Sequence, residues 1–308
     1  MTGSDSVLLA RFVLTRARAV GVDPVALARA AGIGPYALEA SAGSVPGQCY
    51  PRLWELFERR VDVPHVGLRA AERYGMGELG MMDYLLATAP TVGEGFRAVG
   101  EFGSRLSGNR RVAVVAETDR QVTFASESAA RGRGAEVAAQ ASFAYLTGRA
   151  RLAARARITP VAVTLRERAP RRHGPYREFF GTAAVDFGAE VDSLTLRRAD
   201  LDRPQHSADP GLAAVLRRGA AAATLSTPPA RAWVDLLAAE LDSLSDPAPP
   251  GPDRDTADFR AAASLDTVSL SDIARRLGTS PRTVQRRLAA AGTSWSRELA
   301  NARRRAAW

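Results

Sequence analysis

The side chains best suited to bind another molecule lie near the C-terminal end, in the stretch PRTVQRRLAAA from Pro281 to Ala291. Arginine and glutamine carry paired donors and acceptors that match the edges of guanine and adenine in the major groove of DNA. At about 100° per residue, Val284 and Leu288 lie on one side of a helix, and polar side chains lie opposite them. We expect the polar side to contact bases through Arg282, Gln285 and Arg286.

Other residues beside this face suit supporting roles. Ala289 is small enough to let the helix approach a groove closely. Three polar side chains are candidates for contacting phosphates or for positioning the helix: Ser280, Thr283 and Arg287. An ordinary helical hairpin with a solvated basic surface would have the same pattern, and this alternative stays open.

Two short helices joined by a tight turn must position this face. Ser269 can cap the first helix, with Asp272 at its third position, where a carboxylate complements the exposed amides. Gly278 can end that helix in the left-handed conformation. Ser280 and Pro281 then occupy the favoured cap and first positions of the second helix. The buried stripe of the first helix is expected to be Ile273, Ala274 and Leu277.

The positive charge of the chain is concentrated in the same region. The 308 residues carry a formal net charge of +9, and +8 of it lies in the last 34 residues, which hold nine arginines and one acid, Glu298. A localised positive field favours a polyanion, because phosphates release counterions when cations bind them. All 42 basic residues are arginine, which is typical of a GC-rich genome, so the location of the charge is more informative than the residue type.

The stretch LSDIARRLGTSPRTVQRRLAAAGTSWSREL resembles the first helix-turn-helix of the AraC/XylS family of bacterial transcriptional regulators. The resemblance covers about 40 residues and is most specific in SPRTVQRRL and AGTSW. Family members carry two such units joined by a long helix, whereas this chain ends at NARRRAAW, about where the connecting helix would begin. We therefore expect the chain to be truncated within its DNA-binding domain.

The remaining pattern predicts an α+β fold. Residues 6 to 75 have helical periodicity, with Trp54 and Phe57 on the core side of one helix. Beyond Asn109 the period becomes strand-like in RRVAVVAE, QVTFAS, VAVTLRE, AAVDF and SLTLR, and a long helix from Glu136 to Arg155 interrupts the series. Two more helices, AAVLRRGAAAATL and ARAWVDLLAAELDSL, follow. Uneven interleaving of strands and helices indicates a mixed sheet rather than a doubly wound fold.

Three parts are predicted along the chain. Residues 1–245 form an α+β ligand-sensing and dimerisation domain, and residues 246–255, DPAPPGPDRD, form a proline-rich linker. Residues 256–308 form the DNA-binding domain with its first helix-turn-helix only. The segment DTADFRAAASL is expected to supply a helix that packs behind the other two.

The N-terminal region also resembles a known domain. LGMMDYLLATAPTVGEGF, YREFFGTAAVDF and LRRADLDRPQHSADP resemble the arabinose-binding-like sensing domain of a branch of the same family, over roughly residues 10 to 220. The resemblance does not fix the effector, because members respond to different ones. The aromatic and glycine landmarks that match are interpreted as structural: Tyr176, Phe180, Gly181 and Phe187.

One motif suggests a different chemistry. Gly75 to Gly80 satisfies G-x-G-x-x-G, and Glu94 or Glu101 follows at about the distance expected for a dinucleotide site. Such a site needs a strand before the first glycine, but VGLRAAERY has a helical pattern. We therefore interpret these glycines as a connection between helices.

Other catalytic patterns are missing from the sequence. His65, His173 and His206 are far apart and lack metal-ligand spacing, so we interpret them as structural or surface residues. No G-x-S-x-G elbow or P-loop occurs. The basic loop ERAPRRHG, residues 167 to 174, is interpreted as a solvated turn, with binding of an anion or DNA as the alternative.

Cysteine content and hydropathy indicate the cellular setting. Cys49 is the only cysteine, so no intrachain disulfide can form, and a reducing cytoplasm fits. Arg11, Arg16 and Arg18 interrupt the N-terminal apolar pattern, and no run approaches the 18 apolar residues of a membrane span. We expect a cytoplasmic protein.

These patterns and the resemblance predict a sequence-specific DNA-binding transcriptional regulator that responds to an effector through its N-terminal domain. Its expected partners are double-stranded promoter DNA, a small-molecule effector, a second copy in a homodimer and, for an activator, RNA polymerase. No cofactor, metal, membrane or enzymatic activity is expected, and ligand-binding residues stay unassigned. The alternative is a small-molecule-binding protein or enzyme with a basic tail that contacts nucleic acid.

Overall fold

The fold was analysed in a computed structural model of the chain. The structure describes residues 3–34, 37–38, 43–61, 65–225, 228–245 and 264–306. The predicted linker, residues 246–255, lies outside the described residues, and so does most of the helix expected in DTADFRAAASL.

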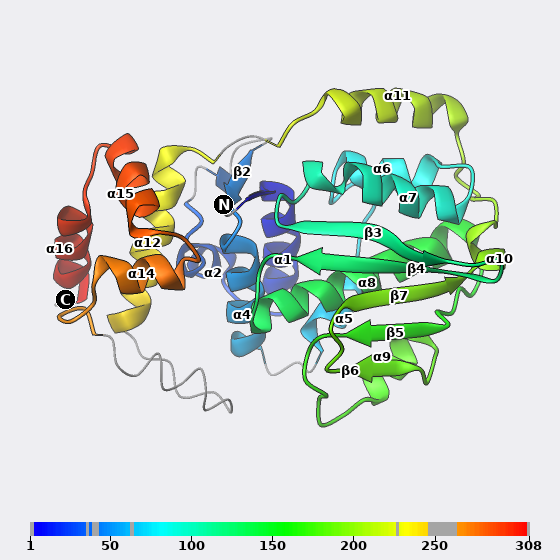
Figure 1. Cartoon of the computed structure of the whole chain (residues 1–308), viewed down its shortest axis with the longest axis horizontal. Coiled ribbons are helices and arrows are strands. Elements are labelled where there is room, and N and C mark those ends of the chain that lie inside the picture. Colours follow the sequence, from blue (N-terminus) through cyan, green and yellow to red (C-terminus); the bar gives the residue numbers. More distant parts are fainter. Residues whose placement is uncertain are drawn as a thin grey trace.

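The N-terminal helices form one end of the larger part of the molecule (Figure 1). Trp54 and Phe57 are buried, and the Trp54 ring centroid lies 6.2 Å from that of Phe12, so the predicted core face is confirmed. The first elements are β1 (Ser4–Ser6), α1 (Val7–Ala19), α2 (Pro24–Ala30), β2 (Ser44–Pro46), α4 (Cys49–Arg60) and α5 (Val66–Glu72), with β1 and β2 antiparallel.

A five-stranded sheet in the order β3-β4-β7-β5-β6 forms the centre of the next region. Its strands are β3 (Arg110–Glu117), β4 (Gln121–Ser128), β5 (Ala162–Leu165), β6 (Val185–Phe187) and β7 (Asp192–Arg197). Only the β5–β6 pair is parallel among these strands. Phe124 pairs with Leu194, and both are buried. The five predicted β-rich runs are therefore confirmed as strands.

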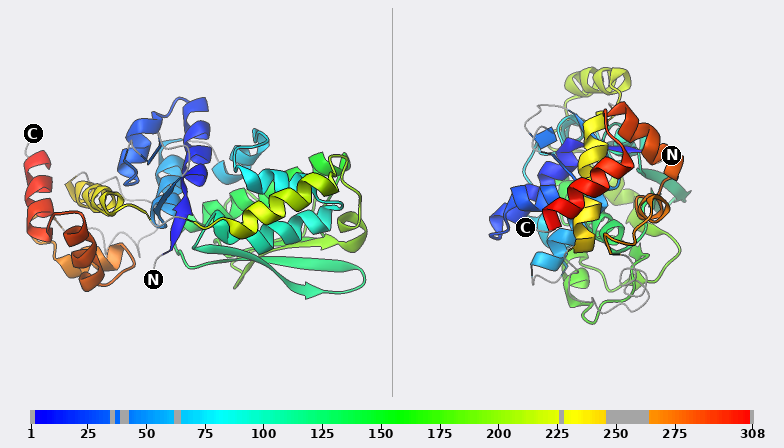
Figure 2. Two further views of the ribbon diagram at one scale, coloured as in Figure 1. Left: turned by 90° about the horizontal axis from the view of Figure 1, so that it is seen from above. Right: turned by 90° about the vertical axis from the view of Figure 1, so that its left-hand side faces the viewer.

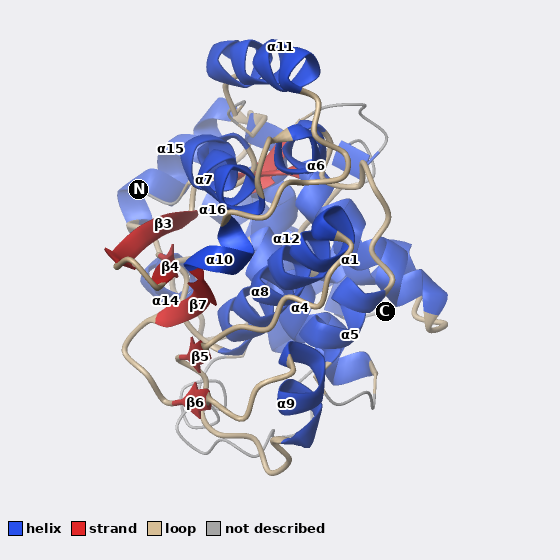
Figure 3. Ribbon diagram, turned by 90° about the vertical axis from the view of Figure 1, so that its right-hand side faces the viewer, coloured by secondary structure: helices blue, strands red, loops and turns tan. Residues whose placement is uncertain are grey.

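Helices gather on one face of this sheet (Figure 3). The longest is α8 (Arg133–Ala154), which matches the helix predicted from Glu136 to Arg155. It approaches α4 closely at Gly134, where an added Cβ would lie 1.9 Å from the carbonyl oxygen of Pro51. The others in this region are α6 (Met81–Thr88), α7 (Val92–Phe102), the 3₁₀ helix η1 (Gly103–Arg105), α9 (Gly174–Phe180), α10 (Arg198–Leu201) and α11 (Pro210–Ala222).

The C-terminal helices form a separate group at one end of the molecule (Figure 2). They are α12 (Ala230–Ser245), α14 (Leu270–Arg276), α15 (Pro281–Ala290) and α16 (Trp295–Ala306). Helix α12 packs against α14, α15 and α16, and also against α2 and β2. A mixed sheet with helices, followed by this helical group, confirms the predicted α+β fold. None of the described helices is long and apolar enough to cross a membrane.

Candidate nucleic-acid interface and sensor cavity

The helix-turn-helix begins and turns as its residues predict. The Ser269 Oγ accepts from the Asp272 amide at 3.2 Å, and Asp272 Oδ2 accepts from the Ser269 amide at 3.1 Å, which completes a capping box. Gly278 has a φ of 59°, in the left-handed region that favours glycine. The Ser280 Oγ accepts from the Thr283 amide at 3.2 Å and caps α15, with Pro281 at its first position. The predicted caps are confirmed.

Helix α15 has one buried and one exposed face. Val284 and Leu288 are 5% and 1% exposed, because they pack into the core of the C-terminal group. Arg282, Gln285 and Arg286 are all exposed on the other side. The structure therefore brings the three predicted base-reading side chains together on one accessible surface, whereas their contact with bases stays a prediction.

The supporting residues differ from one another in position. Ser280 is exposed, and its hydroxyl lies 2.9 Å from the Thr283 hydroxyl at the start of α15. Arg287 instead turns back toward α12, where its guanidinium carbon lies 3.2 Å from the centroid of the Trp233 ring. Burial lowers the pKa of Arg287, and its Nη1 has no hydrogen-bond partner among the described residues. The phosphate contact expected of Arg287 stays a prediction, since it requires the side chain to leave Trp233.

A buried carboxylate joins the C-terminal helices to the N-terminal ones. Glu240 on α12 forms ion pairs with Arg52 of α4 and with Arg276 of α14. Gln48, at the start of α4, donates its Nε2–H to the carbonyl oxygen of Leu277 at 2.6 Å. These partners are 36 to 229 residues apart in sequence, so no local pattern predicts them.

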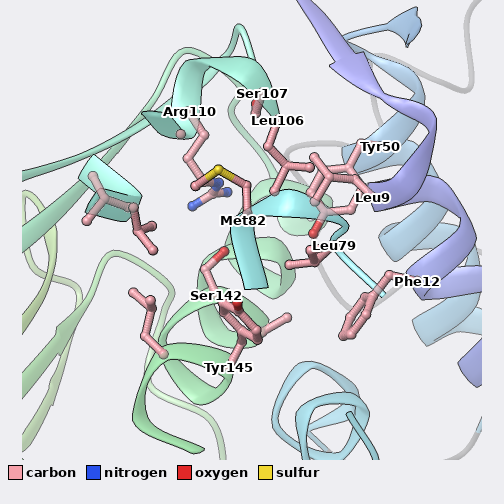
Figure 4. Close-up of a pocket in the computed structure, with 15 residues that line it drawn as sticks. Leu9, Phe12, Tyr50, Leu79, Met82, Leu106, Ser107, Arg110, Ser142 and Tyr145 are labelled. Carbon is pink, nitrogen blue, oxygen red and sulfur yellow. The ribbon is translucent and has the colours of Figure 1, made fainter. Parts of the chain in front are cut away.

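The N-terminal part has a partly open cavity of about 90 Å³, lined by residues of α1, α4, α6, α7, α8 and the η1–β3 connection (Figure 4). No ligand-binding residue was predicted from the sequence, because the lining comes from elements that only the tertiary fold brings together. The apolar side chains that form much of its wall include Leu9, Phe12, Leu79, Met82, Val112 and Leu146.

Arg110 is the charged residue in the wall of this cavity. Its Nη1 donates to the Ser126 Oγ at 2.8 Å, and its Nη2 donates to the Ala135 carbonyl oxygen at 3.3 Å. Burial lowers the pKa of Arg110, while Tyr50, Asp192 and Asp5 oppose this shift electrostatically. Among the described residues, no carboxylate oxygen lies within 4.0 Å of a guanidinium nitrogen of Arg110, so Arg110 forms no ion pair there.

Asp5 lies beside the cavity without lining it. Its Oδ1 accepts from the Ser107 hydroxyl at 2.5 Å and from the Asn109 Nδ2 at 3.4 Å. Burial raises the pKa of Asp5 to about 6, although both hydrogen bonds and Arg110 favour the carboxylate. The Ser107 hydroxyl therefore already donates its hydrogen to Asp5.

The glycine motif at residues 75–80 is not a phosphate cradle. Helix α5 precedes it, which confirms the interpretation as a connection between helices. The amides of Gly77 and Leu79 both donate to Asp83 Oδ2 at 2.9 Å. A buried carboxylate therefore occupies the donors that an anionic phosphate would need.

The surroundings of Cys49, His65 and Glu167 indicate structural roles for these side chains. Burial raises the pKa of the Cys49 thiol, whose sulfur lies 3.7 Å from the Gly32 carbonyl oxygen. The His65 ring packs edge-on against Tyr176 with a centroid distance of 4.7 Å. Glu167, at the start of the basic loop, is buried and accepts from the Tyr176 hydroxyl at 2.8 Å. Among the described residues, no group of three His, Cys, Asp or Glu side chains could hold a metal ion.

An α+β part with a partly open cavity, followed by a helix-turn-helix, is the organisation of a ligand-responsive transcription regulator. Residues 21–205 match the family model of the arabinose-binding domain of AraC transcription regulators, N-terminal. The chain belongs to this family of AraC-type transcription regulators.

Among solved structures, the chain is similar to the transcriptional regulator CdpR from Pseudomonas aeruginosa, with 18% sequence identity and a TM-score of 0.49. The similarity covers 95% of this chain and 82% of CdpR. No curated protein matches the sequence.

Proposed function

We propose that the protein binds double-stranded promoter DNA sequence-specifically and that a small molecule bound by its N-terminal part controls this binding. The observation that carries the proposal is the face of α15, where three exposed forked side chains lie opposite a buried apolar side. Arg282, Gln285 and Arg286 have the donors and acceptors that read base edges in the major groove.

The surroundings of this face support binding to a polyanion. The last 34 residues carry nearly all of the net charge of the chain. Ser280 and Thr283 lie at the N-terminal end of α15, where helix amides favour a phosphate group. Phosphate contacts would orient the helix, and the three base-reading side chains would supply specificity.

Control by an effector requires that the two parts of the molecule have more than one arrangement. Glu240 and Gln48 hold the helix-turn-helix against α4 in the described arrangement. An effector that binds one arrangement more tightly shifts the population by no more than its difference in affinity. In this proposal residues 1–245 sense the effector and pair with a second copy of the chain, residues 256–308 bind DNA, and an activator would also contact RNA polymerase.

Titration of the full chain with duplex DNA from upstream of its own gene tests the proposal. Arg282→Ala and Gln285→Ala should each weaken binding at the cognate site by about 1–3 kcal/mol and change binding to random duplex little. Arg218→Ala is the matched control, because Arg218 is an exposed arginine of α11 outside the C-terminal group. It should leave both affinities unchanged.

Two outcomes would contradict the proposal. Equal losses on cognate and random duplex would reduce Arg282 and Gln285 to phosphate contacts. A wild-type chain that does not prefer any upstream duplex over random sequence would instead favour the alternative, a small-molecule-binding protein whose basic end contacts nucleic acid nonspecifically.

A further inference from the structure

The cavity in the N-terminal part has few free polar hydrogens to offer a ligand. Three hydroxyls in its wall already donate inside the protein: Ser107 to Asp5, Ser142 to the Ala138 carbonyl oxygen at 2.7 Å, and Tyr145 to Asp83 at 2.7 Å. A sugar needs a partner for each of several hydroxyl groups, since unpaired polar groups are costly when buried. The wall is therefore poorly suited to a polyhydroxylated ligand.

Two donors in the wall remain available. The Tyr50 hydroxyl donates no hydrogen bond within the described residues. A guanidinium carries five N–H donors, and those of Arg110 make two hydrogen bonds within the described residues, to Ser126 and Ala135. Figure 4 shows Arg110 among the residues that line the cavity. Arg110 is half-buried, and Asp5 and Asp192 act on it only from beyond ion-pair distance, so a carboxylate in the cavity would supply a closer charge and acceptors in a forked geometry.

The volume limits the size of the ligand. Liquid water takes about 30 Å³ per molecule, and an apolar cavity of about 150 Å³ in another protein holds benzene. A space of about 90 Å³ therefore suits a molecule smaller than benzene, of roughly three to five non-hydrogen atoms. Phe12, Leu79 and Leu146 would surround the apolar end of such a molecule.

We propose that this cavity binds a short-chain monocarboxylic acid of about two to three carbons, with its carboxylate on Arg110 and its alkyl group against the apolar wall. Only the role of this acid as an effector rests on the proposed function. The binding step does not involve DNA.

Calorimetric titration of the full chain without DNA tests this inference, using propionate, propionamide and L-arabinose. Propionamide has the shape of propionate but no charge. Propionate should bind saturably and about tenfold or more tightly than propionamide, because a hydrogen bond to a charged group is stronger than a neutral one. L-arabinose should not bind in this cavity. Equal binding of propionate and propionamide, or no binding of propionate, would overturn the proposal.

Two variants assign the site. Arg110→Gln should remove the preference for propionate over propionamide, and Arg110→Lys should retain part of it. Arg111→Gln is the matched control, because Arg111 is the exposed neighbour on the same strand. An unchanged preference in folded Arg110→Gln, or a lost preference in Arg111→Gln, would contradict the assignment. Where Arg110→Gln fails to fold, Arg110→Lys decides. If propionate binds but leaves the affinity for promoter DNA unchanged, the cavity assignment holds and the regulatory role fails.

Discussion

Arg287 lies with its guanidinium carbon 3.2 Å from the centroid of the Trp233 ring, so a cation of α15 is held on α12. The sequence places Arg287 beside the exposed face of α15, yet its side chain is half-buried. The contact shows that α12 supports the helix-turn-helix from behind. The same arginine cannot stack on Trp233 and contact a phosphate at once.

Removing the Trp233 ring should destabilise the C-terminal helices. Trp233 is 8% exposed, and Trp233→Ala should lower the free energy of unfolding by about 3–5 kcal/mol, mainly through lost packing. Arg287→Ala removes the cation–π contact and should cost about 1–2 kcal/mol. Urea denaturation measures both. If Arg287→Ala leaves stability unchanged but weakens binding to every duplex, Arg287 is the phosphate contact that the sequence predicts.

Glu240 should contribute more to stability than a surface ion pair does. Its side chain is 9% exposed and pairs with two arginines, so Glu240→Gln leaves two partly buried guanidiniums without their carboxylate. We expect a loss of about 2–4 kcal/mol in the free energy of unfolding. Asp242→Asn is the control, because Asp242 is 49% exposed and pairs with an exposed Arg305. This control should cost at most about 1 kcal/mol. Equal losses in the two variants would show that burial of Glu240 does not matter.

Two glycines of α8 should respond oppositely to the same substitution. Gly134→Ala would place a Cβ 1.9 Å from the Pro51 carbonyl oxygen, so α4 and α8 would have to separate. We expect Gly134→Ala to lower the free energy of unfolding by about 1–3 kcal/mol or more, as in other overpacked cores. Gly148→Ala meets no atom within 4 Å and should stabilise the helix by up to about 1 kcal/mol. Thermal unfolding compares them, and a tolerated Gly134→Ala would contradict the close contact of α4 and α8.

The pKa of Asp5 predicts a specific pH dependence of stability. Because its pKa is about 6 in the folded protein and 3.8 ordinarily, the folded state retains the Asp5 proton at higher pH than the unfolded state. The contribution of this group to stability therefore increases as the pH falls from about 6 to about 4. Asp5→Asn does not titrate. The stability of wild type relative to Asp5→Asn should rise on the order of 3 kcal/mol between pH 7.5 and pH 4. A pH-independent difference in urea denaturation would show that Asp5 has an ordinary pKa.

Features set by neighbouring residues could be predicted from the sequence. The capping box at Ser269, the left-handed Gly278 and the start of α15 at Ser280 depend on the side chain at each position and on the amides within three residues of it. The two faces of α15 follow from helical periodicity in the same way. The strands are recognisable because their β-rich runs differ from the helical segments.

Periodicity shows which face of a helix is buried, but not which element covers it. Helix α12 lies within residues 1–245, the predicted sensing part, and its Trp233 and Glu240 contact α15 and α14. The cavity around Arg110 could not be predicted for the same reason. Its wall comes from five regions of the chain, and an arginine at the start of a β-strand has no local sign of lacking an ion-pair partner.

The start of α4 has neighbours on two sides. Tyr50 lines the cavity, while Gln48 and Arg52, two residues before and after it, hold Leu277 and Glu240. About one turn of helix includes all three positions, so a shift of its backbone would move Tyr50, Gln48 and Arg52 together. Two residues along the chain therefore separate the wall of the cavity from a hydrogen bond to the helix-turn-helix.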